Sequence, residues 1–410
     1  MRSIDTALDD LPTGTDLLAD LDAQRTWFVL AELDGRGVVG VSDRWNEHPD
    51  VAAVRHRLGD ALEWAIRERV GPVMHCSADD LASRISQDLS ELDAPPLSAH
   101  LRSHGTVEQY RDFLRHRSLY HLREADPHTT AIPRLTGQAK AGLVEIQNDE
   151  YGDGRIERMH STLFARSMAA LGLDTDHAAY LNAVPAVTLA WINSLTLFAS
   201  RRRLKGAIVG HLLALECTSS LPNKRYAEGL RRLGLGSAAT DFFDEHVEAD
   251  AVHEQIALHD MAIPLLRSEP AQSVEVLTGF RAAIHFDADV GRHLLRSWSV
   301  AGAERAAVSR APVPSAVDSR VGWVGGRGNT QVEAACGCWS STTTRMWPRP
   351  SAGYSPPPGG TSRSAATVWT PWPRRAPRSS MRSCSTSSCP ASTGSRWFAS
   401  CGDVRSGHRW

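Results

Sequence analysis

The stretch His246-Val-Glu-Ala-Asp250-Ala-Val-His253 is the most informative part of this sequence. On an α-helix, where each residue turns by about 100°, Asp250 and His253 lie within roughly a 60° arc with His246. Two imidazoles and one carboxylate would then share a single stripe that contains no lysine or arginine. Such a donor set suits a divalent transition metal, although polar residues of an ordinary helix could give the same pattern. The stretch therefore predicts a helix and a candidate metal site on it.

The sequence around this stretch also has the periodicity of helices. Apolar residues recur at helical spacing in Val54, Leu58, Leu62 and Ile66, and again from Leu81 to Leu92. Only residues 27–33 and 37–41 hint at short strands. We therefore predict an all-α fold, with a helical region at 1–100 packed on a principal bundle at 101–302. Further helical patterns cover 106–125, 134–172, 176–201, 203–220, 222–233, 237–266 and 270–298.

The overall composition is that of a globular protein, with 42% hydrophobic and 22% charged residues among 410. The longest apolar run, 183–200, contains Pro185 and Asn193, which favours a buried core helix over a membrane span. The first residues run into acids rather than an apolar stretch, so no secretory signal is predicted. We expect a soluble, cytoplasmic protein without a membrane partner.

Residues 303–410 differ from the rest of the chain in composition. They hold fourteen arginines against four acids, and five of the seven cysteines, whereas no lysine follows Lys224. A basic tail can bind nucleic acid, but disordered tails are usually poor in the tryptophan and cysteine that are abundant here. The cysteine spacing does not match that of zinc sites either. We expect a disordered tail or one translated from another reading frame, and we predict no nucleic-acid partner.

Other potential metal ligands occur further from the opening stretch. Glu150 and His160 are ten residues apart. On a regular helix this spacing corresponds to a rotation of about 80° around the axis and a rise of about 15 Å along it. They could flank a pair of metal ions only if the helix is distorted, and Gly152 is a place where it could be. Glu216 follows an apolar run without a basic partner one turn away, and Glu124 ends a predicted helix. Taken singly, each of these residues has an ordinary structural explanation.

Taken together, these residues resemble in order and spacing the ligand set of the heme-oxygenase-like diiron oxidases. The resemblance covers residues ~105–298, and is closest to the iron-containing redox enzyme branch. It implies a heme-oxygenase-like helical bundle that binds two ferrous ions and no heme. The stretches that carry it are Arg123-Glu-Ala-Asp-Pro-His128, Asp149-Glu-Tyr-Gly152, Met159-His-Ser-Thr-Leu-Phe164 and His246-Val-Glu-Ala-Asp250. The metal ligands it implies are Glu124, Glu150, His160, Glu216, His246, Asp250 and His253.

The resemblance also implies a division of these ligands between two irons. One iron would take Glu124, His160 and His246, and the other would take Asp250 and His253 together with Glu216. Glu150 would bridge the two ions or lie near both, and Glu150 and Glu216 are the residues expected to take part in catalysis. A manganese–iron pair would suit the same ligand types.

The implied activity is that of an oxidase or oxygenase, which uses dioxygen to oxidise a small organic molecule by N-oxygenation or by C–H or C–C cleavage. An external electron donor is expected, and a homodimer is compatible with the sequence. No residue identifies the substrate, because fold and ligands define the oxidant whereas the pocket selects the molecule oxidised. Three alternatives stay open: an iron-binding protein without oxygenase activity, a heme-binding or cofactor-free protein on the same bundle, and a non-catalytic helical partner protein.

Overall fold

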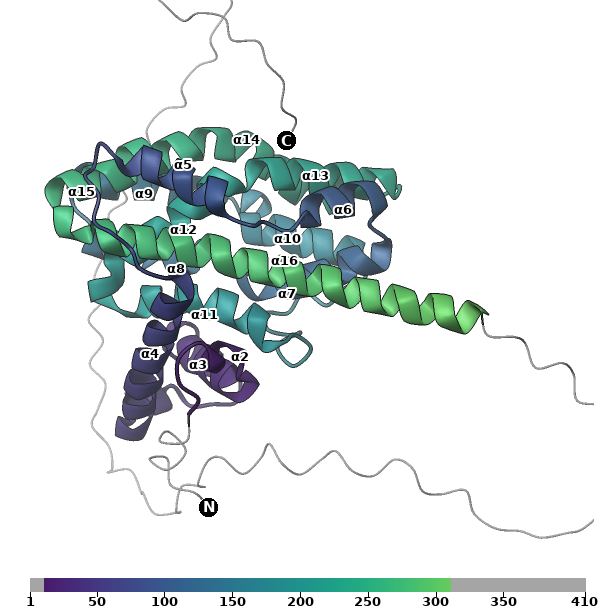
Figure 1. Ribbon diagram of the computed structural model, residues 1–410, viewed down its shortest axis with the longest axis horizontal. Coiled ribbons are helices and arrows are strands. Elements are labelled where there is room, and N and C mark those ends of the chain that lie inside the picture. The colour runs from purple at the N-terminus through teal and green to yellow at the C-terminus, as the bar shows by residue number, and fades with distance from the viewer. Residues whose placement is uncertain (1–10, 311–410) are drawn as a thin grey trace, which may run out of the picture. The chain divides into compact units, whose positions relative to one another are not determined.

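The computed structural model describes residues 11–310, except for the side chains of residues 250, 251 and 301–310. Within this range the chain contains helices and turns and no strand, so the predicted all-α fold is confirmed (Figure 1). The α-helices are α2 (Asp16–Ala19), α3 (Leu21–Gly35), α4 (Pro49–Val70), α5 (Leu81–Glu91), α6 (Leu97–His104), α7 (Val107–His121), α8 (Asp126–Thr129), α9 (Gly137–Glu150), α10 (His160–Ala170), α11 (Ala186–Ser200), α12 (Lys205–Thr218), α13 (Ser220–Arg232), α14 (Ser237–Gln255), α15 (Ile263–Ser268) and α16 (Ser273–Arg310). A π-helical segment, η6 (Ile256–Ala262), joins α14 to α15.

Several predicted boundaries are wrong. Residues 27–33 lie inside α3 and residues 37–41 form turns, because the apolar run at 27–33 fits a helix with a wide buried face as well as a strand. The last helix continues to Arg310 rather than ending at 298. The interpretation of residues 311–410 falls outside the described residues, and the predicted domain boundaries stay predictions.

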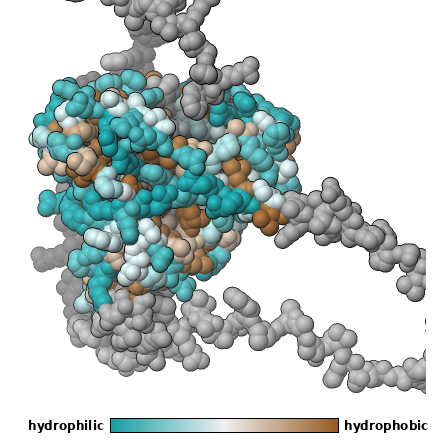
Figure 2. Space-filling model, in the orientation of Figure 1, coloured by the Kyte–Doolittle hydropathy of each residue, from teal (hydrophilic) through white to brown (hydrophobic). Residues whose placement is uncertain are grey.

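The apolar run at 183–200 forms α11, which is buried from Thr188 to Ala199. It packs against α3 on one side and α16 on another, as expected of a core helix. None of the described helices combines the length and hydrophobicity needed to cross a membrane. On the face drawn in Figure 2, hydrophilic residues cover most of the described surface and hydrophobic ones form small groups between them.

Helix α16 crosses the bundle (Figure 1) and packs closely against α12 at two glycines. A Cβ atom added at Gly210 would lie 1.8 Å from the carbonyl oxygen of Val276. One added at Gly279 would lie 1.8 Å from the carbonyl oxygen of Ala207. The two backbones can approach this closely only because neither glycine has a side chain.

We expect Gly210→Ala to lower the free energy of unfolding by about 2 to 3 kcal/mol, because the new methyl group meets backbone that moves only with the whole of α16. Chemical denaturation followed by circular dichroism would measure the change. Gly35→Ala is the matched control, since a Cβ added there meets nothing within 4 Å. Equal stability of the two variants would contradict the close α12–α16 contact.

A buried ion-pair network connects the N-terminal helices to the segment after α7. Arg123 pairs through Nη1 with Oε1 of Glu32 on α3, and Nε2 of His177 lies 3.1 Å from the other carboxylate oxygen of Glu32. Burial alone would raise the pKa of Glu32, but the hydrogen bond with His177 and the charge of Arg123 outweigh it and lower this pKa. The network matters for the site because Arg123 immediately precedes Glu124.

Candidate metal centre

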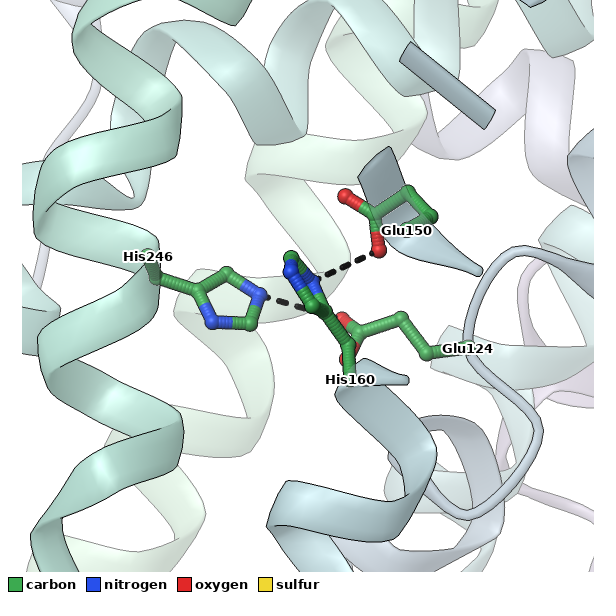
Figure 3. A group of neighbouring side chains, drawn as sticks. All are labelled: Glu124, Glu150, His160 and His246. Carbon is green, nitrogen blue, oxygen red and sulfur yellow. Dashed lines mark ion pairs between the residues drawn. The ribbon is translucent and has the colours of Figure 1, made fainter. Parts of the chain in front are cut away.

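Six of the seven predicted ligands meet in the interior of the bundle, each with at most 7% of its surface exposed. One group of ligand atoms lies within 4.8 Å of one another and comes from Glu124, Glu150, His160 and His246 (Figure 3). A second group, within the same limit, comes from Glu150, Glu216 and His253. We call them the first and the second cluster. Glu150 belongs to both. The side chain of the seventh predicted ligand, Asp250, lies outside the described residues, although its backbone is part of α14.

These candidate ligands come from several segments of the chain. Glu124 follows α7, Glu150 is the last residue of α9, and His160 is the first residue of α10. Glu216 lies on α12, whereas His246 and His253 both lie on α14. The single helix predicted for 134–172 is therefore wrong. The chain leaves the helix after Glu150 and begins a new one at His160, so the two side chains meet from different elements.

The break between α9 and α10 depends on glycine. Gly152 has φ +63°, and a Cβ at this position would lie 2.6 Å from the backbone of Arg158 and Met159. Two short 3-10 turns, η3 (Gly152–Gly154) and η4 (Ile156–Arg158), then complete the reversal. Nδ1 of His160 thereby comes within 2.9 Å of Oε2 of Glu150. On a straight helix the two residues would be about 15 Å apart along the axis.

The contacts within the clusters are close but do not have the geometry of hydrogen bonds. Oε2 of Glu150 and Nδ1 of His160 are 2.9 Å apart, yet both are buried atoms without a hydrogen-bond partner. Oε2 of Glu124 and Nδ1 of His253 are likewise without one, and the latter lies 3.4 Å from Oε2 of Glu216. Buried polar atoms are nearly always paired. Ligand atoms that crowd together without forming hydrogen bonds are therefore the arrangement expected around a cation.

In both His246 and His253, the ring nitrogen that points away from the clusters lies close to a hydrogen-bond acceptor. Nδ1 of His246 lies 2.7 Å from the carbonyl oxygen of Phe242, and when it donates there Nε2 keeps a lone pair. That Nε2 is 3.6 Å from Oε1 of Glu124 (Figure 3). In His253 the two nitrogens have the opposite roles. Nε2 lies 3.0 Å from Oδ2 of Asp149, and Nδ1 faces Glu216 in the second cluster. Metal-ligating histidines typically donate their second nitrogen in this way, which fixes the ring and its tautomer.

Asp149 was not predicted as a site residue, although it precedes Glu150 in one of the quoted stretches. We expect Asp149→Asn to weaken metal binding at the second cluster by about 10- to 100-fold and to leave the first cluster nearly unchanged. Anaerobic ferrous titration would separate the two binding steps. Glu145→Gln, another exposed acid on α9, is the control. An equal loss at both clusters would contradict a specific role for Asp149.

His121 is a second residue that sequence reasoning missed. Its Nδ1 lies 2.7 Å from Oε1 of Glu124, and its ring packs against Phe164 and Phe242. It is in neither cluster, so we assign it the role of holding the Glu124 carboxylate in place. Its spacing of three residues from Glu124, near the end of a helix, was the available signal.

The charges of the clusters depend on one another. Burial would raise the pKa of Glu124, but the charges of His121 and His246 outweigh it and hold this pKa well below its usual range. Burial would lower the pKa of His253, but the adjacent Glu216 carboxylate, together with the hydrogen bond to Asp149, raises it to about 9. Protonated imidazoles thus balance the buried carboxylates, and a divalent cation could take over that positive charge on displacing the protons.

The residues present therefore fit a pair of transition-metal ions. Imidazole and carboxylate donors suit iron and manganese, and several negative ligands balance the charge of two divalent ions. Glu150, shared by the two clusters, could serve both ions of a two-metal site. Fold and donor set together define a helical protein with buried carboxylate–histidine clusters that could hold metal ions.

Part of this chain matches the model of a known protein family. Residues 111–288 match the model of the family described as iron-containing redox enzyme, which confirms the resemblance seen in the motifs. The chain is also 29% identical over 148 residues to nitrosourea synthase from Streptomyces achromogenes subsp. streptozoticus, a match that covers 36% of this chain. The chain spans only 31% of the length of that relative. A CADD-like protein of unknown function from Nostoc punctiforme PCC 73102 has a crystal structure with TM-score 0.42 and 18% identity, covering 54% of this chain and 97% of its own.

Proposed function

We propose that this protein is a non-heme diiron oxidase or oxygenase that uses dioxygen to oxidise a small organic molecule. The observation that carries the proposal is the position of Glu150, whose carboxylate belongs to both clusters. A shared carboxylate between two groups of donors is what a pair of ions requires, and a single-ion site would not need the second group. The match to a family of iron-containing redox enzymes supports iron as the metal.

Each ion would be held by residues of one cluster. Glu124, His160 and His246 would bind the first, and Glu216 and His253 the second. Glu150 would contact both, and Asp250 is proposed for the second ion from its position on α14. Two ferrous ions would supply the electrons that activate dioxygen, and an external donor would restore them for further turnovers.

The remaining residues of the site form a pocket for the substrate. A cavity of about 460 Å³ reaches Glu124, Glu150, Glu216 and His246. Its volume is within the range of small-molecule sites. Aromatic rings form much of its wall and keep water from the reacting atoms. They belong to Phe113, Tyr120, Phe164, Trp191, Phe242 and Phe243.

Tyr120 contributes a hydroxyl group to this wall. Burial, together with the negative charges of Glu124, Glu150 and Glu216, raises its pKa well above the usual value. The hydroxyl therefore keeps its proton at physiological pH and can donate a hydrogen bond to an acid or to a bound molecule.

The type of oxidation is proposed from the relative. The name nitrosourea synthase describes a product with oxidised nitrogen, so N-oxygenation is the first reaction to test, with C–H and C–C cleavage after it. The partners we propose are a small-molecule substrate and an electron donor, and a homodimer is compatible with the proposal.

The test is an anaerobic ferrous titration of the full chain, followed by mixing with dioxygen in the presence of candidate substrates. Two irons per chain and an oxygen uptake that depends on substrate are expected. Binding of two irons with an oxygen uptake unaffected by any substrate would instead indicate an iron-binding protein without oxygenase activity. Failure to bind iron would overturn the proposal.

A further inference from the structure

The chain makes a turn directly after Glu124, and a residue within this turn has a strained backbone. Ala125 has φ +78° and ψ −36°, in a region that residues other than glycine rarely occupy, because the Cβ atom crowds the neighbouring carbonyl oxygen. We call residues 123–126 the Ala125 turn, since the N–H of Asp126 donates to the carbonyl oxygen of Arg123 at 3.2 Å. A strained conformation of this kind persists only where the surrounding structure holds it in place.

The hydroxyl group of Tyr151 holds the far end of this turn. It donates a hydrogen bond of 3.0 Å to Oδ1 of Asp126 and lies 2.9 Å from Oγ1 of Thr129. Thr129 contacts the strained residue, because its N–H donates to the carbonyl oxygen of Ala125 at 3.0 Å and its Oγ1 lies 3.1 Å from the same oxygen. One hydroxyl group therefore contacts both residues that fix the chain after Ala125.

The near end of the turn is held by a different part of the protein. Arg123 is paired with Glu32 of α3 in the buried network described above. Ala125 thus lies between two anchored residues, Arg123 and Asp126. The strain in its backbone can be released only if one of these anchors gives way. The anchor at Arg123 is buried, whereas Asp126 and Tyr151 are partly exposed.

Tyr151 is also placed between two metal ligands. It directly follows Glu150, the carboxylate shared by the clusters, and Asp126 lies two residues after Glu124. The hydrogen bond between Tyr151 and Asp126 therefore joins the two segments of the chain that carry these carboxylates. Ligand atoms of Glu124 and Glu150 lie within 4.8 Å of each other in the first cluster. A movement of the Ala125 turn would change that distance directly.

The hydroxyl group of Tyr151 keeps the proton that it donates. Burial and the negative charge of Asp126 raise the pKa of Tyr151 to about 12, although the hydrogen bond with Thr129 lowers it. The contact with Asp126 is thus a hydrogen bond from a neutral phenol to a carboxylate. Hydrogen bonds with a charged acceptor are among the stronger ones in proteins.

We propose that Tyr151 is a positioning residue of the metal centre, whose hydroxyl group holds the strained Ala125 turn and thereby fixes Glu124 relative to Glu150. Without this hydroxyl group the backbone of Ala125 would relax, and the carboxylate of Glu124 would move out of the first cluster. The inference rests on the proposed metal centre and adds a residue that acts on it through Glu124.

Hydrogen exchange in the metal-free full chain tests whether Tyr151 holds the turn. Mass spectrometry would follow peptides that cover residues 123–129. The amides of Asp126 and Thr129 should exchange about tenfold faster in Tyr151→Phe, because the turn that protects them opens more often. Tyr180→Phe is the matched control and should leave this exchange unchanged. Tyr180 is another partly exposed tyrosine, and its oxygen accepts from the N–H of Asp174 outside the site.

Anaerobic ferrous titration tests whether the turn positions Glu124. Tyr151→Phe should weaken iron binding at the first cluster by about tenfold or more, and at the second by less than about twofold, because Glu124 belongs to the first cluster alone. If Tyr151→Phe does not fold, Asp126→Asn is the alternative. It keeps an acceptor oxygen but weakens the hydrogen bond, and it should give a smaller loss at the same cluster.

A second substitution distinguishes positioning from a purely structural contact. Glycine adopts the conformation of Ala125 without strain, so the double variant Tyr151→Phe/Ala125→Gly has little strain to release. It should recover iron binding at the first cluster to within about threefold of the unchanged protein. Tyr151→Phe/Ala178→Gly is the control and should bind iron as weakly as Tyr151→Phe. Ala178 also has a positive φ, +63°, but lies outside the Ala125 turn.

Unchanged exchange at the Ala125 turn in Tyr151→Phe, an equal loss of iron affinity at both clusters, or no recovery with Ala125→Gly would overturn the inference. The two proposals remain separable. Failure of the unsubstituted protein to bind iron would refute the diiron function, while hydrogen exchange still decides whether Tyr151 holds the turn. Two irons bound as tightly in Tyr151→Phe as in the unsubstituted protein would refute the positioning role alone.

Discussion

Glu150→Ala should weaken binding of both metal ions, by at least about 100-fold each, because its carboxylate is the group shared by the two clusters. Removing His246 instead should act mainly on the first cluster, since His246 belongs to that one alone. Anaerobic ferrous titration with metal analysis would show the difference directly. Oxygen uptake with substrate should fall to background in Glu150→Ala.

The matched control for this experiment is Glu157→Gln. Glu157 is an exposed acid on η4, seven residues after Glu150 on the same connection. The Glu157→Gln protein should bind iron as the unchanged protein does. Circular dichroism would confirm that both variants fold. A Glu150→Ala protein that still binds two irons with unchanged affinity would show that Glu150 does not join the clusters.

Glu32→Gln should lower the free energy of unfolding by about 3 to 5 kcal/mol at pH 7, because it leaves the buried guanidinium of Arg123 without its acid. The effect should depend on pH. Since the folded protein lowers the pKa of Glu32 below its ordinary value of 4.5, the ionised carboxylate stabilises the fold above that pH. This stabilisation is lost as the pH falls below 4.5 toward the folded-state pKa, so the two proteins should become more alike in acid.

Chemical denaturation at pH 7 and at about pH 3.5 would measure both parts of this prediction. Glu47→Gln, an exposed acid on a surface turn, is the control and should change stability by less than about 0.5 kcal/mol. A difference between Glu32→Gln and the unchanged protein that stays the same in acid would show that ionisation of Glu32 is not what stabilises the network.

Much of the fold could be predicted because its helices have clear stripes and clear ends. The apolar spacing of Leu58, Leu62 and Ile66 predicted α4, and the separate helical patterns at 203–220, 222–233 and 237–266 match the breaks between α12, α13 and α14 to within a few residues. The errors arose where the same local sequence pattern is compatible with two kinds of secondary structure. Residues 151–159 continue a helical pattern, but Gly152 adopts a backbone conformation that stops the helix, and periodicity does not report it.

For the site, residue type and order named seven candidate ligands, and the structure brings the side chains of six of them together. Their division between two ions stays a prediction, as does the role of Asp250. The contact of Asp149 with His253 could not be derived in the same way, because it depends on how α9 packs against η6 and the end of α14, which spacing along the chain does not reveal. The contact of His121 with Glu124 does have a local signal, its spacing of three residues.

The reversal at Gly152 has a consequence for how such proteins diverge or can be redesigned. The connection from Glu150 to His160 is exposed at residues 153–158, so its side chains can be exchanged with little effect on packing. Its number of residues cannot change as freely, because Glu150 ends α9 and His160 begins α10, so the connection must bring the side chains at its two ends to within 2.9 Å of each other. In this loop, length is under stronger constraint than identity.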